Sequence, residues 1–405
     1  MLLKFLVITL PISSALQLIN GENNLYPTYI LISPIAHHLS HLLINYISNM
    51  KGLLLCGGFG TRLRPLTLSI PKPLVEFCNK CILWHQTKAM VSAGVTEIIL
   101  AINYKPECIQ SYLQELEKEF KVLFYISKEE TPMGTAGPIR LAESELMKGD
   151  CEDFFVFNSD IICDYPLVEM LAMHKAAKKQ GTLVVVEVPD PSRYGSIIIN
   201  EKNEIMQFIE KSKVIVSTKI NAGLYLLNRK MISMIPKKNT SIEREIFPDM
   251  AKNSNLMAYL HKGYWLDIGQ PKDFIIATEM FLKHANKLYI QPNTKGNVLV
   301  DESAKVDSTA VLGPNVVIGP KCVIEAGVRI ENSTILAGTV VGAHTMIKGS
   351  IIGWGNVIGK WVRIDGLTVT GEAVEIKDEI YINGAMILPQ KAISENVKEE
   401  GKVLL

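Results

Sequence analysis

The stretch LCGGFGTRLRPLTLSIPKPL occupies residues 55–74 and begins where the apolar run GLLLC, at 52–56, ends. A short apolar run of this kind predicts a buried strand, so the glycines fall in the turn that follows it. Those glycines are Gly57, Gly58 and Gly60. Because they lack side chains, backbone N–H groups in the turn can approach phosphate oxygens closely. The stretch therefore predicts a phosphate-binding turn.

Charged residues in the same stretch strengthen this interpretation. Thr61 and Arg62 follow the last glycine, and Lys72 lies in the phrase PKP. The positive charges of Arg62 and Lys72 suit a polyphosphate. The turn is neither a GxxxxGK[ST] loop nor a GxGxxG fingerprint. The combination nevertheless favours polyphosphate binding over a turn with no function.

Apolar runs alternate with amphipathic segments on the carboxyl side of this stretch. Strands are expected at 52–56, 96–103, 121–127 and 153–158, and helices at 82–94, at 106–119 and up to about residue 147. Such alternation predicts a mostly parallel sheet with helices on both faces. Ligands of such sheets bind beyond the carboxyl ends of the strands, which is where the glycine turn lies.

Past about residue 295 the pattern changes to a period of six. Aliphatic residues recur at 312, 318, 324, 330 and 336, after which the period slips by one residue and resumes. Repeats of this length predict a parallel β-helix, in which each short strand forms one side of a coil. Stacked coils have exposed ends, so we also expect self-association.

Composition restricts the remaining possibilities. The chain has 405 residues, of which 42 are basic and 41 are acidic, and its formal net charge is +1. It therefore lacks the excess positive charge that attracts a nucleic-acid backbone. The seven cysteines are an odd number and fit a reduced compartment. Cys78 and Cys81 form one CxxC, which suits a zinc or redox site less well than two ordinary thiols.

Residues 1–49 are a leader of uncertain status. Lys4 precedes a short apolar run, which resembles a secretory signal but is too short to span a bilayer. Met50 opens MKGLLLCGG, which has the form of a natural start. We expect a dispensable leader and a cytoplasmic protein, since the chemistry described below needs cytosolic nucleotides.

Several further sequence motifs follow the glycine turn along the chain. They are MGTAGP (133–138), FNSDIICDYP (157–166), RYGSI (193–197), FIEKS (208–212), INAGLYLL (220–227), SIEREIFP (241–248) and GYWLDIGQPKDF (263–274). Together with the repeats they resemble the sugar nucleotidyltransferases, and most closely the eukaryotic mannose-1-phosphate guanylyltransferase family. The resemblance covers nearly everything from Met50 onward.

The resemblance implies a fold and a reaction. It implies a Rossmann-like mixed-sheet nucleotidyltransferase domain over 50–290, followed by a left-handed parallel β-helix over 296–395. The phosphate of mannose 1-phosphate would attack the α-phosphorus of GTP, giving GDP-mannose and diphosphate. Asp160 and Asp267 would hold Mg²⁺, which suits one or two carboxylates completed by phosphate and water.

Other residues acquire roles from the same resemblance. Lys211 would contact the sugar phosphate and Glu210 the sugar hydroxyls, although Ser212 replaces the usual proline of EKP. Cys81 likewise replaces the proline of NKP. The remaining expected contacts are Gly195, Asn221 and Gly223 in the sugar pocket and Gly134 near the base.

Alternatives remain open at this stage. The same reaction could use another pair of substrates, giving ADP-glucose or a UDP-sugar. The chain could instead be a non-catalytic regulatory subunit, a reading opposed by the presence of Arg62, Lys72, Asp160 and Asp267. The β-helix could be an acyltransferase domain, but it offers only His344 as a catalytic histidine. We expect a homo-oligomer, with or without a paralogous regulatory subunit, and neither nucleic acid nor membrane as a partner.

Overall fold

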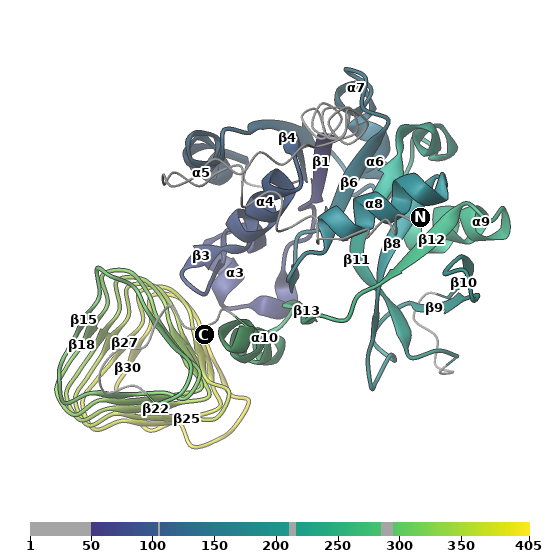
Figure 1. Cartoon of the computed structure of the whole chain (residues 1–405). Helices are drawn as coiled ribbons and strands as arrows, with labels where there is room; N and C mark the ends of the chain where they lie inside the picture. Colours follow the sequence, from purple (N-terminus) through teal and green to yellow (C-terminus); the bar gives the residue numbers. More distant parts are fainter. Residues whose placement is uncertain (1–49, 104–105, 210–215, 285–294) are drawn as a thin grey trace, which may run out of the picture. The chain divides into compact units, whose positions relative to one another are not determined.

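The computed structural model describes residues 50–103, 106–209, 216–284 and 295–405. A nine-stranded mixed sheet is built around β1 (Met50–Leu55), which pairs in parallel with β4 (Val95–Ile102) and β6 (Asp153–Asn158) (Figure 1). Strand β5 (Leu123–Lys128) extends the parallel part beyond β4. These are the four strands that the sequence pattern predicts.

The other half of the sheet is mostly antiparallel. Strand β11 (Lys219–Asn228) runs antiparallel to both β6 and β8 (Gly181–Glu187). The remaining members are β9 (Ser196–Ile199), β10 (Ile205–Ile209) and β12 (Leu256–Leu260). The expected mixed sheet is therefore confirmed.

Helices cover both faces of the sheet. They are α4 (Ile82–Ser92), α5 (Pro106–Phe120), α6 (Gly137–Leu141), α7 (Glu143–Leu146), α8 (Leu167–Ala177) and α9 (Phe247–Lys252). Side chains of a strand point alternately to its two faces, so the neighbours Leu53 and Leu54 enter two different hydrophobic clusters. Both side chains are fully buried. The continuous apolar run of β1 is thus explained by burial on both faces.

The carboxyl-terminal part is a parallel β-helix of three all-parallel sheets. The first contains β14 (Val298–Val300), β17 (Val316–Ile318), β20 (Ser333–Ile335), β23 (Ile351–Ile352), β26 (Val369–Thr370), β29 (Met386–Ile387) and β31 (Val403–Leu404). The second contains β15 (Lys305–Val306), β18 (Val323–Ile324), β21 (Val340–Val341), β24 (Val357–Ile358), β27 (Glu375–Ile376) and β30 (Ala392–Ile393). The third contains β16 (Val311–Leu312), β19 (Arg329–Glu331), β22 (Met346–Lys348), β25 (Arg363–Asp365) and β28 (Tyr381–Asn383). This arrangement is consistent with the expected left-handed β-helix.

The slip in the six-residue period has a structural cause. Leu312 pairs with Ile330, eighteen residues further on, whereas Ile330 pairs with Ile347, only seventeen residues further on. The shortening falls at the corner between the third and first sheets, because Ile330 and Ile335 are five positions apart. The parallel pairing continues on both sides of this corner, so one corner absorbs the variation in coil length.

The first sheet of the β-helix packs against the helix α10 (Pro271–His284). Phe274 and Ala277 of α10 share a hydrophobic cluster with Val317 and Leu336. The Asn79 side chain also donates a hydrogen bond to the carbonyl of Ile318 at 2.9 Å. The β-helix is therefore in direct contact with the helix that begins within the motif GYWLDIGQPKDF.

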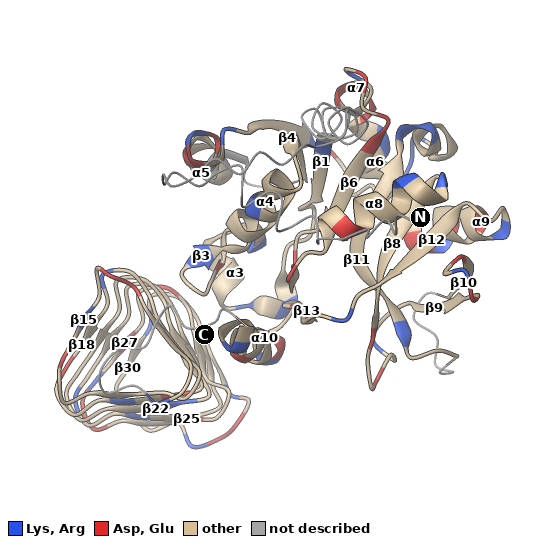
Figure 2. Cartoon of the chain, in the orientation of Figure 1, with Lys and Arg blue, Asp and Glu red and all other residues tan. Residues whose placement is uncertain are grey.

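Figure 2 shows basic and acidic residues intermixed over the described parts of the chain, in keeping with the near-zero net charge. Within those parts, no helix is both long enough and apolar enough to cross a bilayer.

Candidate active site

The glycine turn lies at the carboxyl end of β1, beside the end of β6. Gly60 has a φ of 63°, in the left-handed region, and its carbonyl accepts a hydrogen bond from the Thr67 hydroxyl at 2.8 Å. A Cβ atom on Gly60 would lie 2.9 Å from the Thr67 methyl group. Both conformation and space therefore require glycine at this position.

A cavity of about 490 Å³ opens over this turn, and we call it the glycine-turn cavity. Eight of the expected site residues line it, namely Gly57, Gly58, Gly60, Thr61, Arg62, Lys72, Gly134 and Asp160. The structure thus brings together residues from the turn, from the MGTAGP phrase and from the end of β6.

A second cavity of about 610 Å³ lies along β11 and β13 (Trp265–Asp267), and we call it the β11 cavity. It is lined by the other expected residues that the structure describes, namely Gly195, Asn221, Gly223 and Asp267. The two cavities share Arg62, Gly134, Thr135, Asn158 and Asp160 as lining residues. Ligands in the two cavities would therefore meet at Asp160.

The two expected metal ligands are held by backbone pairing. Strand β13 pairs antiparallel with β7 (Ile161–Cys163), which places Asp267 opposite Ile161. The backbone N–H of Ile268 also donates to the Asp160 carbonyl at 2.9 Å. Two phrases more than a hundred residues apart in the sequence are thereby joined at one point.

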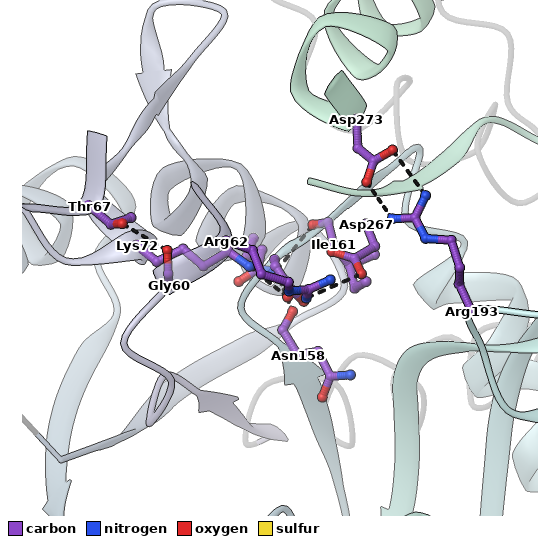
Figure 3. A network of polar contacts seen from close by, with 11 residues as sticks. Gly60, Arg62, Thr67, Lys72, Asn158, Ile161, Arg193, Asp267 and Asp273 are labelled. Atoms are coloured by element: carbon purple, nitrogen blue, oxygen red, sulfur yellow. Dashed lines mark hydrogen bonds and ion pairs between the residues drawn. The ribbon is translucent and has the colours of Figure 1, made fainter. Parts of the chain in front are cut away.

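Each of the two carboxylates has a cation beside it, as Figure 3 shows for Asp267. Lys72 Nζ donates to Asp160 Oδ2 at 2.7 Å, and Arg62 Nη2 lies 4.0 Å from Asp267 Oδ2 (Figure 3). Burial, together with the neighbouring negative charge of Asp160, raises the pKa of Asp267 to about 6. Lys72 and Arg62 oppose this shift.

The donor set fits a divalent metal ion that is also bound by phosphate. Asp267 Oδ1 is buried and has no hydrogen-bond partner within the described residues. The described ranges contain no group of three or more His, Cys, Asp or Glu side chains that could hold a metal by themselves. Two carboxylates with the rest of the coordination shell left to phosphate and water is the arrangement that Mg²⁺ commonly uses.

Not all of the residues singled out in the sequence lie in the two cavities. Glu210, Lys211 and Ser212 lie outside the described residues, as does the leader 1–49. Cys78 and Cys81 are both buried and free. Burial raises the pKa of the Cys81 thiol to about 11 and that of Cys78 well above its usual range, so both are ordinary protonated thiols rather than a reactive pair.

The structure also brings to the cavities residues that we did not predict. Arg193 lines the β11 cavity, and its guanidinium donates to both carboxylate oxygens of Asp273, at 3.4 and 2.7 Å (Figure 3). Asn103 and Glu129 line the glycine-turn cavity. The sequence did contain a signal for these two residues. Both follow strands that were predicted to be parallel, β4 and β5, and the ends of those strands lie at the edge of the sheet that carries the glycine turn.

Comparison with known proteins identifies the class that this fold and site define. Residues 51–284 match the nucleotidyl transferase family, and residues 294–403 match the GMPPB C-terminal domain family. The chain therefore belongs to the nucleotidyl transferase family.

The similar curated proteins have names that are more specific than the family. Mannose-1-phosphate guanyltransferase of Candida albicans is 50% identical over 363 residues, which are 88% of this chain and 100% of that protein. Mannose-1-phosphate guanyltransferase beta-B of Xenopus laevis is 49% identical over 356 residues, 86% of this chain and 99% of that protein. A crystal structure of a putative glucose-1-phosphate thymidylyltransferase from Bacillus anthracis matches with a TM-score of 0.52 at 22% identity. That match covers 60% of this chain and 98% of the other, and it supports the fold alone.

Proposed function

We propose that the protein is a mannose-1-phosphate guanylyltransferase, which transfers the guanylyl group of GTP to α-D-mannose 1-phosphate and releases diphosphate. The observation that carries this proposal is the shared wall of the two cavities at Asp160 and Arg62. A nucleotide over the glycine turn and a sugar phosphate along β11 would have their phosphates adjacent there. The names of the relatives at about 50% identity supply the guanine and the mannose.

In this proposal the protein aligns two anions and neutralises their charge. The attacking phosphate oxygen is already ionised near neutral pH, so no general base is needed. Backbone N–H groups of the glycine turn and the charges of Arg62 and Lys72 would bind the triphosphate and stabilise the departing diphosphate. Mg²⁺ held by Asp160 and Asp267 would reduce the repulsion between the phosphates when bound. Lys211 would contact the sugar phosphate and Glu210 the sugar hydroxyls.

Ring packing and hydrogen bonds fix one wall of the β11 cavity, where the sugar would bind. Tyr194 packs edge-on against Trp265, with ring centroids 5.4 Å apart, and Trp265 Nε1 donates to the Ala222 carbonyl at 2.9 Å. The backbone N–H of Asn221 donates to the Gly195 carbonyl at 3.0 Å. These contacts fix the wall that carries Gly195, Asn221 and Gly223.

We further propose that the enzyme acts in the cytoplasm as a homo-oligomer or together with a paralogous regulatory subunit.

The test is diphosphate release by the purified full chain. Mannose 1-phosphate and glucose 1-phosphate are each combined with GTP, ATP, UTP and dTTP in the presence of Mg²⁺, and kcat/KM is measured for each pair. We expect GTP with mannose 1-phosphate to be the preferred pair. A preference for another pair would identify a different pyrophosphorylase. Release with no pair, despite intact folding, would support a non-catalytic subunit.

A further inference from the structure

The second sheet of the β-helix carries a row of outward-facing side chains. It lies on a different side of the β-helix from the first sheet, which α10 contacts (Figure 1). Its strands stack in parallel register, so that one outward position of each strand falls in line. We number the coils from the one that contains β15. From the first coil to the fifth, the row contains Lys305, Val323, Val340, Val357 and Glu375, and we call it the valine row.

The three valines of this row are accessible to solvent although they are apolar. Half of the surface of Val357 is exposed, and Val323 and Val340 are partly exposed. At the corner that follows the row, Trp361 is 62% exposed, and its ring stacks on that of His344 with centroids 4.3 Å apart. Contiguous apolar groups exposed on the surface of a folded domain are typical of a protein interface.

Charged side chains stand at both ends of this face, in opposite order. Lys305 lies at the first coil and Glu375 at the fifth. Two positions further along the chain, on the same face, these coils carry Asp307 and Lys377, whose backbone N–H groups continue the ladder to the next coil. The first coil therefore presents a base followed by an acid, and the fifth coil presents an acid followed by a base.

This order makes the face complementary to a second copy of itself. Two such faces can pack about a two-fold axis that runs parallel to the strands through the third coil, so that the first coil of each copy faces the fifth coil of the other. Lys305 then faces Glu375 of the second copy, and Asp307 faces Lys377 of the second copy. Val340 faces Val340 of the second copy. If the coils of the two copies ran in the same direction, each charge would face its own equivalent, which is repulsive.

The shapes of the two ends of the face also match. A hollow of about 700 Å³ opens on this side of the β-helix, with Ala304, Ala326 and Ala343 in its wall. Trp361 belongs to the fourth coil, and in this arrangement it faces the second coil of the other copy. The residue at the equivalent corner of the second coil is Gly327, which has no side chain. A large aromatic side chain thus meets small residues, as in the well-packed centre of many interfaces.

We infer that the second sheet of the β-helix is a self-complementary interface between two copies of this chain, whose coils run in opposite directions. This interface places the proposed homo-oligomer on one side of the β-helix rather than at its exposed ends. Five coils spaced about 4.8 Å apart span only about 19 Å. The interface is therefore small, and we expect a reversible dimer that dissociates on dilution.

The first experiment measures association of the purified full chain by sedimentation velocity at several protein concentrations. Lys305→Glu and Glu375→Lys should each raise the dissociation constant by about 10- to 100-fold, because like charges then face each other at both ends of the interface. An equimolar mixture of the two variants should associate as wild type does, since each altered charge then meets an opposite one. Lys348→Glu, which changes an exposed lysine of the third sheet, is the matched control and should behave as wild type.

The second experiment tests the direction of the coils by cross-linking. Facing sheets lie about 10 Å apart, a distance that a short bismaleimide linker spans. Val340→Cys should give a cross-linked dimer, because this position faces itself across the axis. Val323→Cys and Val357→Cys should each give little dimer alone but a heterodimer when mixed. Wild type treated in the same way gives the background of the native cysteines, and thermal melting shows that each variant is folded.

A wild-type chain that stays monomeric at every concentration would overturn the inference, as would oligomers that neither charge reversal weakens. Association that both reversals abolish and mixing does not restore would show that the two charges do not face each other. Cross-linking of Val323→Cys alone as readily as Val340→Cys would show that the coils run in the same direction, and the inference would be wrong. None of these measurements uses the catalysed reaction, so the proposed function stands or fails separately through diphosphate release.

Discussion

Asp160 and Asp267 are the two side chains on which the proposed reaction depends most directly. Asp160→Asn and Asp267→Asn keep the shape of each residue but remove its negative charge. We expect each change to lower kcat on the order of a thousandfold, or about 4 kcal/mol, because one metal ligand loses its charge. The double variant should be barely slower than either single variant, since both residues act through one ion.

Steady-state rates at increasing Mg²⁺ concentration check this prediction. Asp150→Asn, which changes an exposed aspartate near the start of β6, serves as the control and should keep its activity. Near-normal turnover of either single variant at saturating Mg²⁺ would remove that residue from the metal site. Strictly additive losses in the double variant would exclude a shared ion.

Asp267 also predicts a pH dependence of stability. Burial and the charge of Asp160 raise its pKa to about 6, above its ordinary value near 4. A raised folded-state pKa means that the contribution to stability is complete below about pH 4 and is lost as the pH rises through 6. In metal-free buffer, Asp267→Asn should therefore melt at a higher temperature than wild type at pH 7.5, with the difference shrinking toward pH 4. A lower melting temperature for the variant at pH 7.5 would contradict this.

The sequence was most informative about single residues that lie within sequence motifs. The glycines, Arg62, Lys72 and the two aspartates could be predicted because their chemistry and spacing are local. Glu129 follows a predicted strand, but its burial against Gly57 and the pairing of Arg193 with Asp273 could not be predicted, because both depend on partners distant in the chain. A charged residue after a strand looks the same in sequence whether it is buried or solvated.

The helix α4 contains a histidine whose surroundings keep it neutral. His85 Nε2 lies 2.8 Å from the Phe77 carbonyl, and its ring packs edge-on against Phe281 with centroids 5.4 Å apart. Desolvation, with smaller contributions from Lys88 and Lys80, lowers the pKa of His85 to about 4. Protonating this side chain therefore opposes the packing of α4.

Because the folded-state pKa is lower than the unfolded value of about 6.5, stability is complete above pH 6.5 and declines as the pH falls toward 4. The decline should be about 2 kcal/mol, less than the full shift implies, since His85 keeps some solvent contact. Urea unfolding at several pH values should show that His85→Gln loses less stability than wild type between pH 6.5 and 4. His284→Gln, at an exposed position of α10, should retain the wild-type profile.

Among the elements, the strands β1, β4, β5 and β6 and the helices α4 and α5 could be predicted because each is a single uninterrupted pattern, whereas the helix expected to end near residue 147 is two short helices, α6 and α7. The pairing of β13 with β7 could not be predicted, since these strands of three residues carry almost no periodic signal. Yet this pairing is what joins Asp267 to Asp160. The site is thus assembled by short elements that sequence periodicity does not reveal.

Side chains of α10 and of the β-helix share one hydrophobic cluster. Val317 is fully buried there, whereas Val323, on the second sheet, is partly exposed. Val317→Glu would place an unpaired charge in this hydrophobic cluster, and we expect a loss of several kcal/mol in unfolding free energy. Val323→Glu should cost far less. Equal melting temperatures for the two variants would show that the contact contributes little to stability.

The corner between the third and first sheets of the β-helix has a consequence for how this chain can change over time. Coils of seventeen and eighteen residues stack on one another with their strands still in register. A single codon gained or lost at this corner would therefore leave the neighbouring coils, and the face that contacts α10, where they are. A change in the length of the β-helix at this corner would therefore not displace the nine-stranded sheet. The corner is also the natural place to insert a reporter peptide.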